Sequence, residues 1–346
     1  MIQDTYVRGF FSNSIIANNY TFSIKFFLLF LFLGIFLIHD TVFSTKVIVE
    51  TYNLLLLFSI FPVLLLLVSI NNFFFFYVGL EFISLLTYIL LFLNKTTNAF
   101  EAGIKYFTSG GLISGAFILF GISNLWNIFG SVDIVDIVII LGCQKEMTSL
   151  MVFSFIFIIV GFLFKLAAFP MQQWAPSVYS GVPYSQLGFI MVLFKFTLLA
   201  VFLRFYITLQ PAFFFFISPV TYGISIGSMC VGLIGIAYST HNLSIKKFIA
   251  YSSITHVGYI FAIIVDTTSE DALWLGLYYS ALYSISILLF FIVLSRFLTI
   301  NKLEDNFSFK EVETFIDLQK FYNSLKYAGS VSSFYKIEFF LLLVSV

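Results

Sequence analysis

The sequence predicts an all-α protein that crosses a membrane several times. Of its 346 residues, 60% are hydrophobic and only 10% are charged, whereas a soluble domain carries about 25% charged residues. A spanning helix needs about 20 mostly apolar residues. Apolar runs of this length follow one another near residues 22–39, 50–70, 73–94, 102–128, 148–169, 186–208, 212–239, 246–265 and 271–299.

The remaining segments are too polar or too short to span. No cleavable signal is visible at the start of the chain, so residues 1–45 are expected to form an N-terminal segment with one transmembrane helix. Residues 133–142 are expected to lie at the membrane interface. Residues 301–333 are hydrophilic and predict an extramembrane loop. The short apolar run 334–346 predicts a truncated transmembrane helix.

The composition indicates which kind of genome encodes the chain and which kinds of partner it has. The formal net charge is zero, which gives no reason to expect nucleic acid as a partner. Phenylalanine occurs 49 times, a bias typical of an A+T-rich genome, and we therefore expect an organelle-encoded gene. The few lysines and arginines do not fix the orientation in the membrane.

Known cofactor motifs do not occur in this sequence. It has no glycine-rich phosphate loop, no dinucleotide fingerprint and no Cys/His cluster with metal-ligand spacing. Cys143 and Cys230 stand far apart in apolar surroundings, and we expect them to be buried free thiols. The sequence therefore predicts neither a metal nor a redox cofactor bound to this chain.

A lysine inside an apolar helix is the most informative feature. Lys165 is followed five residues later by Pro170. A lysine at bilayer depth costs roughly 2.5–3.5 kcal/mol on insertion scales, so it needs a partner, a water-filled cavity or a function. Pro170 removes a backbone donor and predicts a helix break just beyond the lysine.

Two further charged residues lie in neighbouring apolar runs. Glu81 stands near the middle of its run, and the functional interpretation pairs it with a lysine of another helix. The structural alternative is a neutral carboxyl that bonds a local hydroxyl such as Ser84. Lys105 lies close to a helix start, where it either serves a proton path or extends to the membrane surface.

Lys195 and His256 complete the set of candidate proton carriers. Lys195 is about ten residues inside its run, and it is expected to face Lys165 across a cavity, because consecutive helices carry the two lysines. A buried lysine that exchanges its proton suits a relay. His256 has Ser252, Ser253 and Thr255 nearby. It either joins this path or is a hydrogen-bonded core residue.

Several blocks resemble the family of NADH dehydrogenase subunit 2, an antiporter-like membrane subunit of respiratory complex I. The resemblance covers roughly residues 70–265. The blocks that carry it are Leu80-Glu-Phe-Ile-Ser-Leu-Leu-Thr-Tyr88, Glu101-Ala-Gly-Ile-Lys-Tyr-Phe107, Lys165-Leu-Ala-Ala-Phe-Pro170, Trp174-Ala-Pro-Ser-Val-Tyr179-Ser-Gly-Val-Pro183 and Ile245-Lys-Lys-Phe-Ile-Ala-Tyr-Ser-Ser-Ile-Thr-His-Val-Gly-Tyr259.

The resemblance implies a fold of two inverted five-helix repeats, each with a broken helix. Residues 46–208 would form the first repeat and residues 209–300 the start of an incomplete second repeat. It also implies roles for single residues: Glu81 and Lys165 as the acid–base pair, with Lys195 as the bridging lysine. By the same resemblance Lys105 would lie on the approach to this path and His256 on the hydrated axis toward the second repeat.

The sequence departs from the family at three places. Phe194 stands where the family has a proline before the bridging lysine, and Ser177 stands where it has an aspartate. The second repeat lacks the family's Gly-Ile-Pro-Pro type segment, and the sequence does not decide whether Lys336 is the lysine of that repeat. We expect the missing helices to come from a separately encoded companion chain.

By this resemblance the chain is expected to be a proton-translocating subunit of NADH:ubiquinone oxidoreductase in the mitochondrial inner membrane. It would carry no redox catalysis itself, because flavin, iron–sulfur clusters and quinone would belong to other subunits. Its partners would be other complex I membrane subunits, antiporter-like neighbours among them, and membrane lipids. A stand-alone cation/proton antiporter and a scaffold without pumping are the alternatives.

Overall fold

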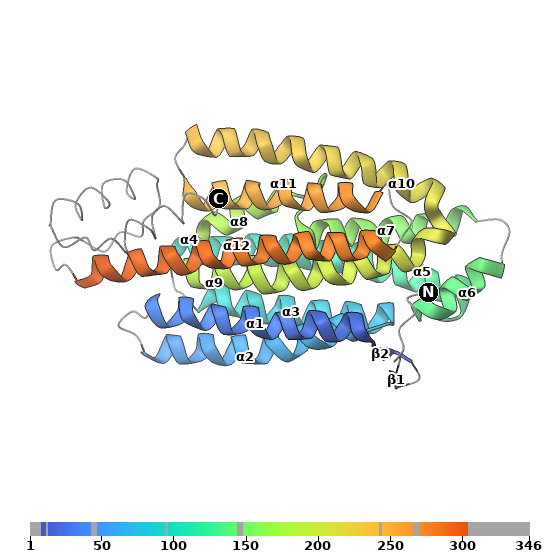
Figure 1. The fold of residues 1–346 in the computed structure, drawn as a ribbon, viewed down its shortest axis with the longest axis horizontal. Helices are drawn as coiled ribbons and strands as arrows, with labels where there is room; N and C mark the ends of the chain where they lie inside the picture. Colours follow the sequence, from blue (N-terminus) through green and yellow to red (C-terminus); the bar gives the residue numbers. More distant parts are fainter. Residues whose placement is uncertain are drawn as a thin grey trace.

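The chain forms a long bundle of helices that run roughly parallel and antiparallel to one axis (Figure 1). The computed structural model describes residues 8–11, 13–42, 47–93, 96–143, 148–241, 244–265 and 270–303. The helices are α1 (Asn19–Val42), α2 (Val47–Ser69), α3 (Phe73–Phe92), α4 (Thr97–Ile113), η1 (Ser114–Leu119), α5 (Phe120–Phe129), α6 (Ile134–Cys143), α7 (Ser149–Leu166), α8 (Trp174–Gly181), α9 (Tyr184–Phe189), η2 (Ile190–Phe194), α10 (Lys195–His241), α11 (Ile245–Val265) and α12 (Glu270–Leu303).

The prediction of an all-α polytopic membrane protein is confirmed. Within the described residues, nine helical stretches are long and apolar enough to cross a bilayer. Their bounds agree with the predicted apolar runs to within a few residues, since hydrophobic length dominates the signal. Residues 133–142, expected to be too short to span, form the ten-residue helix α6. The loop predicted for residues 301–333 and the truncated helix predicted for residues 334–346 lie outside the described residues, except that residues 301–303 belong to α12.

One boundary differs from the prediction. Two separate runs, 186–208 and 212–239, are joined by helix α10, which continues through both. At about 1.5 Å per residue its 47 residues exceed the roughly 30 Å hydrocarbon core, so one straight span cannot hold it. The ribbon of α10 bends back near residues 210–217 and supplies two arms (Figure 1).

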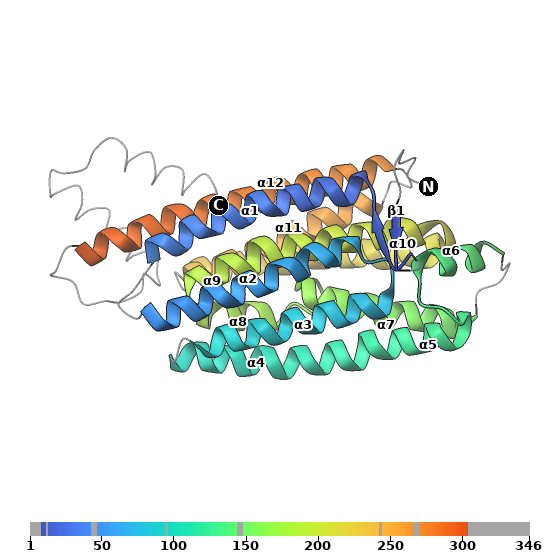
Figure 2. The same cartoon turned by 90° about the horizontal axis from the view of Figure 1, so that it is seen from below.

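The first arm is the centre of the bundle. Residues 186–206, which lie in α9, η2 and the start of α10, are all buried, whereas the windows of the other spanning helices are 28–67% buried. Figure 2 shows α1 and α12 on one side of this arm and α3 and α4 on the other. Side chains on this arm are therefore shielded from lipid, whereas the outer helices expose large apolar residues such as Phe26 and Leu112.

Local polar contacts mark the helix ends. Asn72 caps α3 by accepting from the backbone amides of its first turn, and Thr96 and Thr148 cap α4 and α7. At the end of α2, the Arg204 guanidinium of the central arm donates to the carbonyl of Val68 at 2.7 Å and to that of Ile70. A cation at a helix C-terminus stabilises the exposed carbonyls there, and no pattern in the sequence indicates this partner.

Short strands that the sequence did not predict lie near the N-terminus. β1 (Arg8–Phe10) pairs antiparallel with β2 (Ile15–Ala17). A bridge from Ile15 to Ile70 ties this hairpin to the α2–α3 connection.

One prediction about the cysteines is wrong. Cys230 is an exposed thiol on the outer arm of α10, because the apolar residues around it in the sequence lie on an outward-facing surface. The side chain of Cys143 lies outside the described residues.

Candidate functional site: buried charges along the bundle interior

Helix α7 ends directly after the buried lysine. Lys165 occupies its last turn and is 3% exposed. Ala167 follows in the left-handed conformation with φ 57°, and the amide of Ala168 donates to the carbonyl of Leu163 at 2.8 Å. These contacts end the helix at Leu166, four residues before Pro170. The chain resumes helical structure only at Trp174, so residues 167–173 form the break.

The indole of Trp174 contacts the end of α7 at the break. Trp174 Nε1 donates to the carbonyl of Phe164 at 2.9 Å, which satisfies a backbone acceptor freed at the helix end. The Trp174 ring also stacks on Tyr106 of α4, with centroids 5.0 Å apart and an interplanar angle of 18°. The break is thus packed within protein, as irregular backbone at membrane depth requires.

Lys165 is buried and Glu81 is half-buried, and no ion pair joins them in the described part of the chain. The Glu81 carboxylate is the acidic group whose charge acts on Lys165. Among the described residues, neither Lys165 Nζ nor Glu81 Oε1 has a hydrogen-bond partner. The Ser84 hydroxyl bonds the Glu81 carbonyl at 2.8 Å, and its distance to Glu81 Oε2 is 3.5 Å. Since 3.5 Å is long for such a bond, Ser84 does not replace a charged partner.

Lys195 makes a different set of contacts from those expected. Its Nζ donates to the Ser253 hydroxyl at 2.9 Å and to the Ser253 carbonyl at 3.2 Å. Lys195 is 3% exposed and therefore bound within the protein. These contacts place Lys195 against Ser253 of α11, and they do not test the expectation that Lys165 and Lys195 face one another.

His256 lies three residues after Ser253 on α11, hence on the side of that helix that Lys195 contacts. Its Nδ1 is 2.8 Å from the Tyr279 hydroxyl of α12, and its ring lies 4.4 Å from the Tyr283 ring, centroid to centroid. Lys195 acts on His256 electrostatically. The Tyr283 hydroxyl is buried without a hydrogen-bond partner in the described part of the chain, and Ser253 is among its polar neighbours.

Buried tyrosines lie near both groups of charges, and the sequence did not single them out. Tyr179 of α8 interacts electrostatically with Tyr106, which also senses Glu81. Tyr179 interacts likewise with Tyr283, beside His256. A buried hydroxyl both donates and accepts a hydrogen bond, so this file of phenols supplies polar atoms between the pairs. Tyrosines in a chain rich in aromatic residues carry no distinctive sequence signal.

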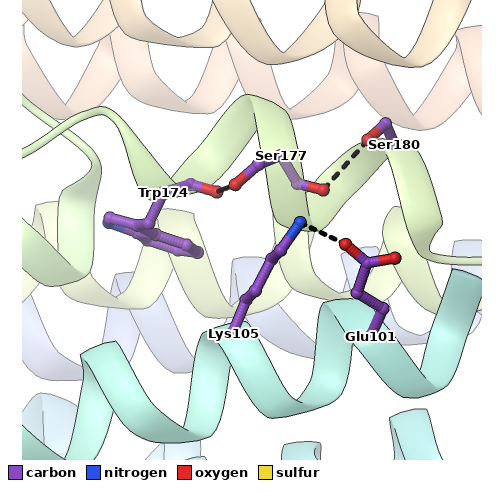
Figure 3. Close-up of polar contacts among 5 residues, drawn as sticks. All are labelled: Glu101, Lys105, Trp174, Ser177 and Ser180. Atoms are coloured by element: carbon purple, nitrogen blue, oxygen red, sulfur yellow. Dashed lines mark hydrogen bonds and ion pairs between the residues drawn. The ribbon is translucent and has the colours of Figure 1, made fainter.

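Lys105 lies apart from these groups. Its side chain is 51% exposed and pairs with Glu101 of the same helix at 2.5 Å. Figure 3 shows both side chains rising from α4 toward Ser177 and Ser180 of α8. This placement matches the surface alternative for Lys105 and not a position in the buried path.

Two π-helical segments lie beside or within the elements that carry Lys165 and Lys195. A π-helical segment, η2, ends at Phe194 and leads into Lys195. Another, η1, packs against α7, the helix of Lys165. π-helical segments occur frequently at functional sites. The helix distortion that the family's proline would cause before the bridging lysine is thus present here without proline, at Phe194.

Together these features define a class of protein: a polytopic bundle with a broken helix and ionisable side chains in its interior, the arrangement of ion-translocating membrane proteins. A model of the family "NADH:quinone oxidoreductase/Mrp antiporter, TM" matches residues 70–328. The chain belongs to this family.

Individual proteins show the same likeness. NADH-quinone oxidoreductase subunit N of Herminiimonas arsenicoxydans is 34% identical over 205 residues, which cover 58% of this chain and 41% of that protein. The chain spans about half the length of the curated relatives it matches.

Two solved structures show the fold. A chain of respiratory complex I from Thermus thermophilus with bound aureothin has a TM-score of 0.63 at 23% identity, over 85% of this chain and 60% of that one. A chain of the Mrp complex from Dietzia sp. has a TM-score of 0.68 at 14% identity, over 82% and 52%.

Proposed function

We propose that this chain is a proton-translocating membrane-arm subunit of an NADH:quinone oxidoreductase. The observation that carries the proposal is the buried ammonium of Lys165 at the end of a broken helix, with the half-buried Glu81 as the acidic group whose charge acts on it. An ammonium with no hydrogen-bond partner in the described structure is stabilised chiefly by that carboxylate. Relatives named as NADH-quinone oxidoreductase subunits support the assignment.

The mechanism follows from moving one charge relative to another. When the Glu81 carboxylate is close to the Lys165 side chain, its negative charge favours the protonated form of the lysine. When it withdraws, the lysine gives up its proton to polar groups along Tyr106, Tyr179 and Tyr283 toward Lys195 and His256. Electron transfer takes place in other subunits, which hold flavin, iron–sulfur clusters and quinone, and it would drive this displacement.

The proposed setting has three further parts. The chain lies in the mitochondrial inner membrane, among other membrane subunits that include antiporter-like neighbours. Membrane lipids cover its outer apolar residues. A further helical segment, on this polypeptide or on a companion chain, covers the apolar face of the outer α10 arm, where Ile226 and Ile234 are 60% and 70% exposed.

Replacement of Lys165 tests the proposal. Lys165→Ala is expected to abolish or strongly reduce NADH-driven proton pumping while the assembly persists, as measured by proton uptake in reconstituted vesicles and by native gel electrophoresis. Lys25→Ala, at a half-buried lysine of α1 outside this path, is the control. Unchanged pumping by the assembled Lys165→Ala enzyme would refute the role.

The second candidate is a cation/proton antiporter that acts outside a redox complex, which the likeness in fold to a chain of the Mrp complex favours. Copurification separates the two functions. Recovery with flavoprotein and iron–sulfur subunits supports the oxidoreductase, and recovery with membrane transporters alone supports the antiporter. A scaffold without pumping predicts that all four of Glu81, Lys165, Lys195 and Pro170 can be replaced without loss of pumping.

A further inference from the structure

A polar pocket lies at the end of the bundle where α4 and α11 begin and α8 ends. It has a volume of about 330 Å³, at the lower end of the roughly 300–1,000 Å³ typical of small-molecule sites. Helix α4 contributes Glu101 and Lys105, α8 contributes Ser177, and the start of α11 contributes Lys246 and Lys247. No residue of the proposed buried proton path lines it.

The lining is strongly basic. It holds three lysines and one acid, Glu101, which already pairs with Lys105 at 2.5 Å. Lys246 packs over the Tyr184 ring, 4.7 Å from its centroid, and Lys247 is half-buried. Both lysines stand in the first turn of α11, which carries no acidic residue. A helix N-terminus is itself electropositive, so lysines there favour an anion as a neighbour.

The hydroxyls of the pocket differ in their bonding. Ser177 donates to the carbonyl of Trp174 at 2.8 Å, and Ser180 donates to that of Ser177 at 2.9 Å (Figure 3). The Ser244 hydroxyl is buried and has no hydrogen-bond partner within the described residues. It lines the same pocket and is a donor for a bound anion. Ser177 carries no charge, so Glu101 is the acidic residue that lines the pocket.

An apolar surface continues from the pocket toward the middle of the membrane. Leu112 stands seven residues after Lys105 on α4, hence on the same side of the helix, and it is 72% exposed. Beside it, Gly111 and Gly115 have no neighbouring atoms within 4 Å of an added Cβ. A charged pocket above an open apolar helix face fits a molecule with an anionic head and hydrocarbon chains.

We propose that this pocket binds the phosphate group of an acidic phospholipid from the surrounding membrane. The head group contacts Lys105, Lys247 and the Ser244 hydroxyl, and its acyl chains lie along Leu112 and the adjacent glycines. Basic pockets at the ends of transmembrane helices recognise anionic head groups in this way. The proposal concerns lipid binding and does not depend on proton transfer.

Lipid retention by the intact assembly tests the proposal. The purified assembly is reconstituted into vesicles of phosphatidylcholine with or without phosphatidylglycerol and extracted again, and bound lipid is counted by native mass spectrometry. Wild type is expected to retain phosphatidylglycerol in preference to phosphatidylcholine. Ser177→Asp, which places a carboxylate in the pocket, is expected to lower this retention about fivefold relative to the isosteric neutral Ser177→Asn.

A second variant and two further measurements keep the result decisive. Lys247→Gln should lower retention by a similar factor, whereas Lys25→Gln, outside the pocket, should not. Equal retention in Ser177→Asp and Ser177→Asn would overturn the proposal. So would binding of added inorganic phosphate with no preference for phosphatidylglycerol, which identifies free phosphate as the ligand. Loss of a neighbouring subunit in Ser177→Asp with unchanged lipid retention would identify a partner's carboxylate instead.

Discussion

Single hydroxyl groups decide how the buried cations are held. Lys195 has two acceptors, both on Ser253, and His256 has the Tyr279 hydroxyl. Because the surroundings are otherwise apolar, losing one such partner costs far more than at a surface. Conservative substitutions that remove one oxygen atom therefore test the proposed path without large changes in packing.

Ser253→Ala removes the hydroxyl acceptor of Lys195 and leaves the backbone carbonyl. A hydrogen bond to a charged group contributes roughly 1.5–3 kcal/mol, so we expect the rate of NADH-driven proton pumping to fall roughly tenfold. Ser252→Ala is the matched control, because the Ser252 hydroxyl bonds only the Ile249 carbonyl of its own helix at 2.9 Å. Equal rates in the two variants would exclude Ser253 from the path.

Tyr279→Phe removes the partner of His256 Nδ1 and keeps the ring. Without it His256 has lost the hydrogen bond that orients its imidazole, and we expect proton pumping and coupled NADH oxidation to fall several-fold. The neighbouring Tyr278 is 65% exposed, so Tyr278→Phe should leave both rates unchanged. A Tyr279→Phe enzyme that pumps like wild type would assign His256 to the core.

At the scale of elements, close packing of two irregular helices holds the lysine in place. A Cβ atom at Gly161 of α7 would meet Ile118 Cγ1 of η1. The backbones approach one turn before Lys165, so a shift of α7 there displaces the lysine from Glu81. Glycine is required at this position by contact and not by its backbone conformation.

Gly161→Ala is therefore expected to lower the free energy of unfolding by about 1–3 kcal/mol, the usual cost of overpacking. Gly111→Ala, in open space on α4, should be neutral or stabilise by about 0.5–1 kcal/mol through higher helix propensity. Thermal unfolding of the two variants in detergent provides the comparison. A Gly161→Ala protein as stable as the Gly111→Ala protein would show that η1 can move away from the added methyl group without lowering the free energy of unfolding.

The elements also show how far a sequence carries a prediction. The spanning helices follow from apolar length alone, and Lys165, Lys195 and Glu81 stand out because charge inside such runs is rare. Contacts between helices produce no comparable pattern in the sequence. The partner of Lys195 is a serine 58 residues away, one of many serines. The Arg204 contact at the end of α2 joins its guanidinium to backbone carbonyls, which no side-chain pattern encodes.

At the scale of the whole molecule, burial separates the proposed path from the lipid-facing surface. Residues 186–206 of the central arm are all buried, and this arm carries Lys195 between the helices that hold the other candidate groups. The outer helices show large apolar side chains on their exposed faces. Such a bundle isolates a row of ionisable groups from bulk water, and proton transfer along the row then depends on the groups themselves.

The assembly to which the chain belongs follows from copurification. We expect a tagged chain to recover NADH oxidation activity from detergent-solubilised membranes, because the proposed function requires flavin and iron–sulfur subunits in the same complex. The Lys25→Gln variant should recover the same activity. Recovery of the chain without any NADH oxidation would favour the antiporter function.

The central claim is that Glu81 and Lys165 act as one unit in proton translocation, and a double-mutant cycle tests it most directly. Protons pumped per NADH oxidised are measured in reconstituted vesicles for wild type, Glu81→Gln, Lys165→Met and the double variant. The proposal predicts that each single change lowers this ratio and that the double variant is no worse than the poorer single one. Independent, multiplying losses, or an unchanged ratio in all four, would contradict it.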